Sequence, residues 1–240
     1  MTAETEDVPT RVGVARITWH RAPDARLTLA LGHGAGGGVG ARDLRALADA
    51  LPPHGVTVAL VEQPWRVAGK RVAPAARTLD AGWEEVWPAL GRPGSPVVAG
   101  GRSAGARVAC RTAAALGARA VLALAFPLHP PGRPERSRAE ELPGADVRCL
   151  VVQGGRDAFG KPEEFPPGPH ELVEVAHADH GFAVPARAPV TQGEALAVIT
   201  DAVVAWTGTL APAPGNAARS ATVEADVRRR DRPRTKGTQS

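Results

Sequence analysis

The sequence predicts an α/β fold in which helices cover both faces of a mainly parallel sheet. Apolar segments of strand length alternate along the chain with segments whose apolar residues recur at helical spacing. The strand segments are continuous apolar runs, which is typical of strands buried on both faces and therefore of parallel sheets. At 240 residues, of which 43% are hydrophobic, the chain is long enough for one such domain and some tail.

The expected elements follow one another in a regular order. We expect strands at residues 13–19, 27–31, 56–61, from 97 onward, 120–126, 149–153 and 172–176. We expect helices at residues 41–51, 78–90, 104–116 and 191–209. The sequence also predicts three regions, namely a disordered N-terminus (1–10), the folded domain (11–210) and a disordered basic tail (211–240).

Charge, cysteine content and hydropathy indicate which partners and which cellular compartment to expect. The net charge is +4, and basic residues cluster in the tail, which favours solvated charges over a specific nucleic-acid site. Cys110 and Cys149 lie in apolar stretches, so we expect buried free thiols in a reducing compartment. The acidic start does not resemble a signal peptide, and no apolar run could span a bilayer. We therefore expect a cytoplasmic protein without a membrane partner.

Ser103 is the first candidate site residue, at the centre of the run GRSAG (residues 101–105). A serine hydroxyl needs an adjacent base and an exposed position to act as a nucleophile. A tight turn from strand to helix exposes it, and flanking glycines let the two elements approach closely. The Ala104 N–H begins the expected helix and can donate to an oxyanion. The pattern predicts Ser103 as a nucleophile.

The glycine-rich run at residues 32–38 follows an expected strand directly. In a serine hydrolase a turn at this place supplies a second oxyanion donor, which we assign to Ala35, with Gly36 as the next candidate. The amide N–H of Ala104 would be the first donor. The sequence contains no C-x-x-C motif or Cys/His cluster that would suggest a zinc site, and we expect no metal and no organic cofactor.

The same run has an alternative interpretation, since Gly32, Gly34 and Gly37 satisfy the dinucleotide-binding pattern G-x-G-x-x-G. Glu62 would then be the acid that binds the ribose. However, Glu62 lies about thirty residues after Gly32 rather than the usual ~20. A strand is also expected before the glycines, whereas this pattern normally opens its fold. These two features disfavour a nucleotide site.

Asp157 and His180 complete the predicted constellation. Asp157 follows the strand expected at 149–153, and His180 lies between the last expected strand and the last helix. An acid that orients a histidine, and a histidine that removes the serine proton, activate the nucleophile. His177 is the competing histidine. The order Ser103, Asp157, His180, each after a different strand, is the order found in α/β-hydrolases.

Five motifs identify a resemblance that covers residues 25–208: LGHGAGG, GGRSAGARVA, FPLHPPGRPE, VVQGGRDAFG and ADHGF. The chain resembles the α/β-hydrolase superfamily, and within it the KANL/Tex hydrolase-like group, which includes bacterial predicted hydrolases related in outline to dienelactone hydrolases. The resemblance implies the α/β-hydrolase fold and a triad of Ser103, Asp157 and His180. Members of the group often have a lysine soon after the histidine, where this chain has Gly181-Phe182-Ala183.

The segment between Pro127 and Cys149 is too short for a cap domain, so we expect an open site. His129 and Arg133 in this segment are candidate substrate-binding residues, although a turn role for His129 and a solvated charge for Arg133 are the alternatives. Arg102 has no expected chemical role beyond packing.

The sequence predicts a serine hydrolase acting on a small acyl substrate (an ester, thioester or activated amide). The alternative is a non-catalytic protein-interaction module on the same fold.

Overall fold

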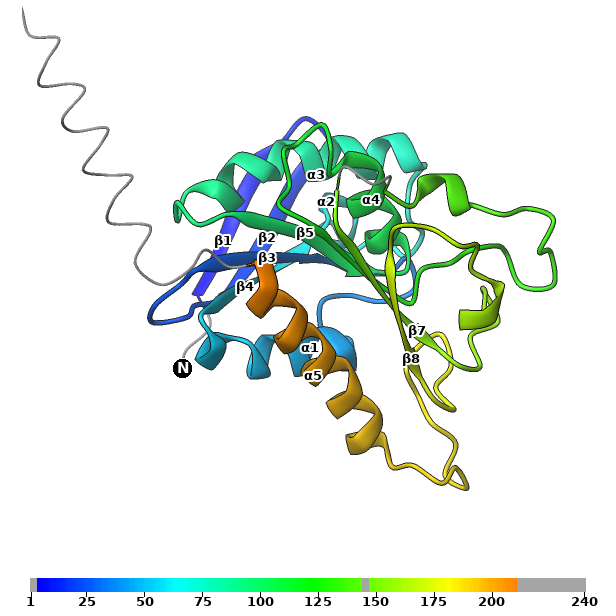
Figure 1. Ribbon diagram of the computed structural model, residues 1–240. Helices are drawn as coiled ribbons and strands as arrows, with labels where there is room; N and C mark the ends of the chain where they lie inside the picture. Colours follow the sequence, from blue (N-terminus) through cyan, green and yellow to red (C-terminus); the bar gives the residue numbers. More distant parts are fainter. Residues whose placement is uncertain (1–3, 144–146, 211–240) are drawn as a thin grey trace, which may run out of the picture. The chain divides into compact units, whose positions relative to one another are not determined.

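The computed structural model describes residues 4–143 and 147–210 (Figure 1). One eight-stranded sheet has the order β1-β2-β4-β3-β5-β6-β7-β8. Neighbouring strands from β4 to β8 are parallel, whereas β2 is antiparallel to both β1 and β4. The strands are β1 (Glu4–Thr10), β2 (Gly13–His20), β3 (Leu27–Gly32), β4 (Val56–Glu62), β5 (Val97–Arg102), β6 (Val121–Leu124), β7 (Cys149–Gly154) and β8 (Glu171–Val175).

Helices cover both faces of this sheet, which confirms the predicted fold class. Helices α1 and α5 pack against each other on one face, and α3 and α4 pack on the other (Figure 1). The short helix α2 contacts β2. The helices are α1 (Arg42–Ala50), α2 (Pro64–Val67), α3 (Ala76–Gly91), α4 (Ala104–Thr112) and α5 (Gln192–Leu210), with 3₁₀ helices η1 (Pro52–His54), η2 (Ala139–Glu141) and η3 (Pro162–Glu164).

The parallel strands are apolar because side chains on both of their faces are covered. All residues of β3 and of β7 are buried. Trp83 and Val86 of α3 are part of the core on one face of the sheet. Cys110 and Cys149 are both buried and free, as expected.

The prediction of a disordered N-terminus is wrong for residues 4–10, which form β1 and pair with β2 from Glu4↔Trp19 to Thr10↔Gly13. The strand is polar because it lies at the edge of the sheet, where much of its surface faces solvent. Ion pairs with β2, such as Asp7 with Arg16 at 2.7 Å, add to the backbone ladder. Residues 1–3 and the predicted basic tail at 211–240 lie outside the described residues.

No cap domain stands between β6 and β7 in the described residues, where η2 is the only helix. Glu141 of η2 accepts hydrogen bonds from Arg107 and Arg111 of α4. Arg138 donates to the carbonyl of Pro127 at 3.0 Å. The charges of this segment therefore fasten it to the domain rather than forming a separate lid.

The turn between β5 and α4 is built on backbone-to-backbone contact. A Cβ added at Gly101 would lie 2.7 Å from the carbonyl carbon of Gly105, and one added at Gly105 would lie 2.6 Å from that of Gly32. Only glycine fits at such separations. Between them, Ser103 has φ 54° and ψ −113°, a conformation that is strained for a residue with a side chain. Ser103 therefore lies at the tip of the sharp turn that joins β5 to α4.

We expect Gly105→Ala to destabilise the domain by about 2 kcal/mol or more, because its methyl group would overlap the Gly32 backbone. The matched control is Gly208→Ala in α5, where an added Cβ meets no atom within 4 Å. That change should leave stability unchanged or raise it by up to about 1 kcal/mol. Urea unfolding of the three proteins measures both effects. Equal stability of the two variants would contradict the packing described here.

Candidate active site

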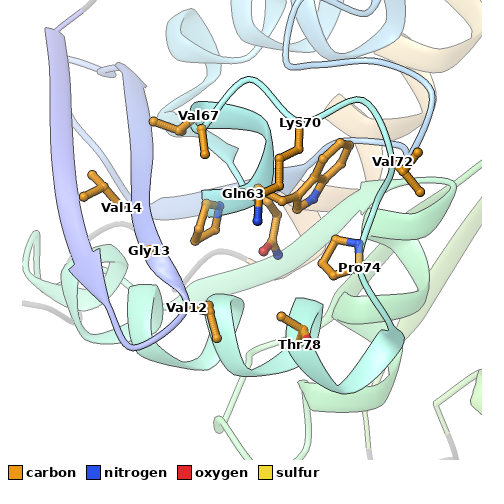
Figure 2. A pocket seen from close by; sticks show the side chains of 12 residues that line it. Val12, Gly13, Val14, Gln63, Val67, Lys70, Val72, Pro74 and Thr78 are labelled. Carbon is orange, nitrogen blue, oxygen red and sulfur yellow. The ribbon is translucent and has the colours of Figure 1, made fainter.

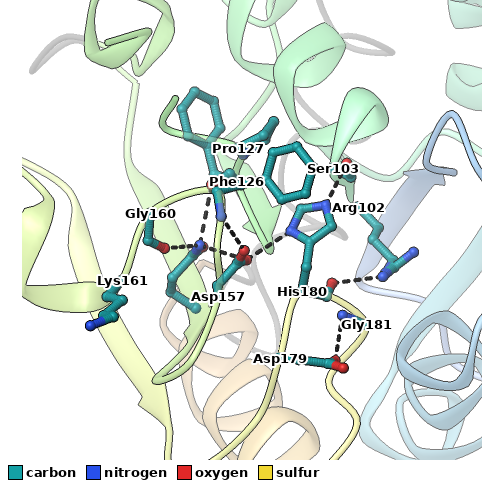
Figure 3. A network of polar contacts seen from close by, with 12 residues as sticks. Arg102, Ser103, Phe126, Pro127, Asp157, Gly160, Lys161, Asp179, His180 and Gly181 are labelled. Carbon is teal, nitrogen blue, oxygen red and sulfur yellow. Dashed lines mark hydrogen bonds and ion pairs between the residues drawn. The ribbon is translucent and has the colours of Figure 1, made fainter. Parts of the chain in front are cut away.

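Side chains that follow three different strands meet in one chain of hydrogen bonds (Figure 3). Ser103 follows β5, Asp157 follows β7 and His180 follows β8. The His180 Nε2 atom lies 2.9 Å from Ser103 Oγ, and His180 Nδ1 lies 2.8 Å from Asp157 Oδ2. The structure thus brings the three predicted residues together. His177, the competing histidine, is exposed and has φ 61°.

Asp157 holds a buried carboxylate that is satisfied by donors on both oxygens. It is 1% exposed. Its Oδ1 accepts from the Phe159 N–H at 2.8 Å, and its Oδ2 accepts from Gln153 Nε2 at 2.9 Å in addition to His180. A carboxylate in this position favours the tautomer of His180 that carries its proton on Nδ1. The Nε2 lone pair then faces the Ser103 hydroxyl.

Gln153 is a site residue that sequence reasoning missed. It is fully buried in β7, and its Nε2 lies near Asp157 Oδ2, the carbonyl of Gly160 at 2.7 Å and the carbonyl of Phe126 at 3.2 Å. All three neighbours are acceptors, so the side chain must present its NH₂ group to them. A lone amide in an otherwise apolar strand, four residues before Asp157, was the available signal.

The His180 ring and backbone are held from two sides. The Phe159 ring lies against the imidazole, with ring centroids 4.2 Å apart and planes inclined by 31°. The Arg102 Nη2 atom donates to the carbonyl of His180 at 2.7 Å (Figure 3). These contacts fix both the plane of the ring and the loop that carries it.

Arg102 also joins this loop to helix α1. Its Nε lies 3.3 Å from Oδ2 of Asp43, a fully buried carboxylate in the first turn of α1. Burial raises the pKa of Asp43, and the positive charge of Arg102 opposes that rise. Arg102 therefore does pack against an adjoining loop, as expected. It also carries the charge opposite a buried acid, which the sequence did not predict.

The glycine-rich turn lies against the serine. A Cβ added at Gly34 would be 3.3 Å from that of Ser103. The Gly37 N–H donates to the carbonyl of Gly34, so Ala35 and Gly36 are the central residues of the turn. Ala104 is the first residue of α4, directly after Ser103. The three predicted oxyanion donors thus flank the serine turn, and their role stays a prediction.

Buried His33 anchors the start of that turn. Its Nδ1 is 2.9 Å from the Gly34 carbonyl, and its Nε2 is 3.1 Å from the backbone nitrogen of Gln63. Burial lowers the pKa of His33 and keeps the ring neutral. A neutral ring that is protonated on Nδ1 donates to Gly34 and accepts from Gln63, so one tautomer satisfies both contacts.

The two predicted substrate-binding residues differ in their surroundings. His129 is 6% exposed, and both ring nitrogens already have protein partners, namely the Pro130 carbonyl at 2.9 Å and Glu164 at 3.3 Å. These contacts assign His129 to the turn, so the structure does not support direct substrate contact for it. Arg133 is exposed on the following turn, and its substrate-binding role stays a prediction.

The dinucleotide interpretation of the glycine-rich run is wrong. The sheet order, with β2 antiparallel and inserted before β4, is not that of a dinucleotide-binding domain. Gly32 serves to let α4 approach β3, as its contact with the Gly105 backbone shows.

We expect Arg102→Met to cost about 3 kcal/mol of stability, because it leaves the Asp43 carboxylate buried without its counter-charge. Adding Asp43→Asn should restore most of that loss by removing the uncompensated charge. Thermal and urea unfolding of the single and double variants measure the coupling. If the two losses simply add, Arg102 and Asp43 are not energetically coupled and this description of the pair is wrong.

A family model described as an alpha/beta hydrolase domain matches residues 25–208. No curated protein is similar enough in sequence to count as a match. None of the helices in the described ranges is both long and apolar enough to cross a membrane.

Several solved structures share the fold at low sequence identity. An α/β serine hydrolase without lid from Xanthomonas campestris is 21% identical, with TM-score 0.69 over 89% of this chain and 97% of that one. The dienelactone hydrolase from Anabaena variabilis is 18% identical, with TM-score 0.64 over 88% and 99%. Esterase 2 from Thermogutta terrifontis, solved after phosphoramylation by tabun, is 17% identical, with TM-score 0.59 over 88% and 97%.

Proposed function

Since the chain belongs to the α/β-hydrolase family, we propose that it is a serine hydrolase that cleaves an ester, thioester or activated amide through an acyl-enzyme. One observation carries the proposal: the continuous chain of hydrogen bonds from Ser103 through His180 to buried Asp157. The similar folds named above include a serine hydrolase, a dienelactone hydrolase and an esterase, which agrees with this class of reaction.

The first half of the proposed reaction forms the acyl-enzyme. Ser103 Oγ attacks the substrate carbonyl carbon while His180 Nε2 accepts the hydroxyl proton. Asp157 stabilises the resulting imidazolium without becoming protonated. The amide N–H groups of Ala104 and Ala35 would stabilise the tetrahedral oxyanion, with Gly36 as the alternative to Ala35. His180 then gives its proton to the leaving group as the carbonyl re-forms.

The second half releases the acid. Water loses a proton to His180 Nε2 as its oxygen attacks the acyl carbon, and the second tetrahedral intermediate is stabilised by the same amide groups. Collapse of that intermediate returns the proton to Ser103 Oγ and frees the carboxylic acid. Every proton is therefore carried by His180, whose ring is held by Asp157, Phe159 and the Arg102 contact to its carbonyl.

The absence of a cap in the described residues favours small or accessible acyl substrates. The β6–β7 segment is fastened to α4 through Glu141 instead of folding over the serine. Arg133, exposed on that segment, is the candidate for contact with an acidic group of the substrate.

We expect Ser103→Ala to lower kcat/KM for p-nitrophenyl acetate at least about a thousandfold, because it removes the nucleophile. His180→Ala should cause a loss of similar size. His177→Ala tests the competing histidine, and Ser137→Ala is a matched exposed serine; both should retain hydrolysis within about threefold. Full activity of Ser103→Ala, or loss in His177→Ala equal to that in His180→Ala, would overturn the assignment.

A further inference from the structure

A cavity of about 340 Å³ is lined by residues outside the candidate triad (Figure 2). Its walls come from the β1–β2 turn, helix α2, the segment after α2 and the start of α3. Its volume is within the range of small-molecule sites, roughly 300–1,000 Å³. Ser103, Asp157 and His180 are not among the described residues that line it.

One wall of this cavity lies far from Ser103. Gly13 and Val14 of β2 line it, and β2 is separated from β5 by β4 and β3. At the usual spacing of neighbouring strands, three steps across the sheet amount to about 14 Å. Gln63 and Trp65, which also line the cavity, contact His33 at the start of the glycine-rich turn, so another part of the cavity adjoins that turn.

The rim of the cavity is unusually apolar for a surface. Among the described residues, the five exposed large hydrophobic side chains include Val12, Val14 and Val72, and all three line this one cavity. Val72 is 81% exposed. Isolated exposed apolar residues are common, but several gathered around one hollow mark a binding surface. Pro64 and Trp65 add buried apolar area to the same lining.

One cation lies over this apolar hollow. Figure 2 shows Lys70 extending across the cavity toward Gln63. Within the described ranges, Lys70 has no acidic side chain within 4.0 Å of its Nζ, in contrast to Lys161, which pairs with Glu163. The segment from residue 63 to residue 79 contains four basic residues and no acidic one: Arg66, Lys70, Arg71 and Arg77. Of these four, only Lys70 lines the cavity, and it is the one charged residue among the described residues that do so.

We propose that this cavity binds a small carboxylate with an apolar body. The carboxylate would pair with the Lys70 ammonium group, and the apolar body would cover Val12, Val72 and Pro74. A neutral apolar ligand would leave Lys70 unpaired, and a polyanion would leave the valines exposed to water. Ser103, Asp157 and His180 do not line the cavity, so binding there does not require the proposed hydrolytic activity.

The test compares two ligands of equal chain length, octanoate and 1-octanol, by titration calorimetry on the full chain. Both should bind. Lys70→Met should weaken octanoate binding about three- to tenfold by removing the counter-charge, and should leave 1-octanol within twofold. Lys161→Met is the matched control and should change neither. Thr78→Trp, which fills the cavity from α3, should weaken both ligands.

Three outcomes would overturn the proposal. They are no binding of octanoate, unchanged octanoate affinity in Lys70→Met, or competitive inhibition of p-nitrophenyl acetate hydrolysis with a constant equal to the dissociation constant. The last result would place octanoate at Ser103. If Thr78→Trp does not fold, the Lys70→Met comparison still decides. Octanoate and 1-octanol contain no ester bond, so the calorimetric result does not depend on whether the protein hydrolyses esters, and the two proposals can fail separately.

Discussion

The close approach of helix α4 to strand β3 is the constraint on which the site depends. The backbones of Gly101, Gly105 and Gly32 come into contact with no room for side chains. This contact forces the sharp turn at Ser103 and brings Gly34 against the serine. The proposed nucleophile and the turn that would bind the oxyanion are therefore positioned by one packing contact at the centre of the sheet.

The other two members of the proposed triad come from loops, and each loop is held by buried polar contacts. Gln153 donates to Asp157, and Arg102 donates to the carbonyl of His180 while its charge faces Asp43. Burying these groups costs free energy unless their partners are correctly placed. Such contacts therefore restrict the loops to the arrangement in which the hydrogen-bonded chain is complete.

Much of this arrangement could be predicted from the sequence. The order of strands and helices follows from the alternation of apolar runs with helical periodicity. That Ser103, Asp157 and His180 lie together could be predicted because each follows a strand of a parallel sheet, where the strand ends share one edge. Gly101 and Gly105 on either side of Ser103 also indicated a turn in which strand and helix backbones touch, because only glycine fits there.

The features that were missed depend on tertiary contacts. Strand β1 has the polar composition of a disordered segment, and it is ordered by its pairing with β2 at the sheet edge. The pair of Arg102 with Asp43 joins residues from different elements, and nothing local indicates that they meet. The position of His129 after a strand did not indicate that its ring would be enclosed by Pro130 and Glu164.

The most direct test of the central claim is covalent labelling of the full chain with a fluorophosphonate, read by intact-protein and peptide mass spectrometry. We expect one phosphonyl group per chain, located on Ser103, with no label in Ser103→Ala and labelling slowed at least about a hundredfold in His180→Ala. A native, folded protein that does not react would contradict the assignment of Ser103 as a nucleophile and favour a non-catalytic interaction module. Equal labelling of Ser103→Ala would contradict it as well.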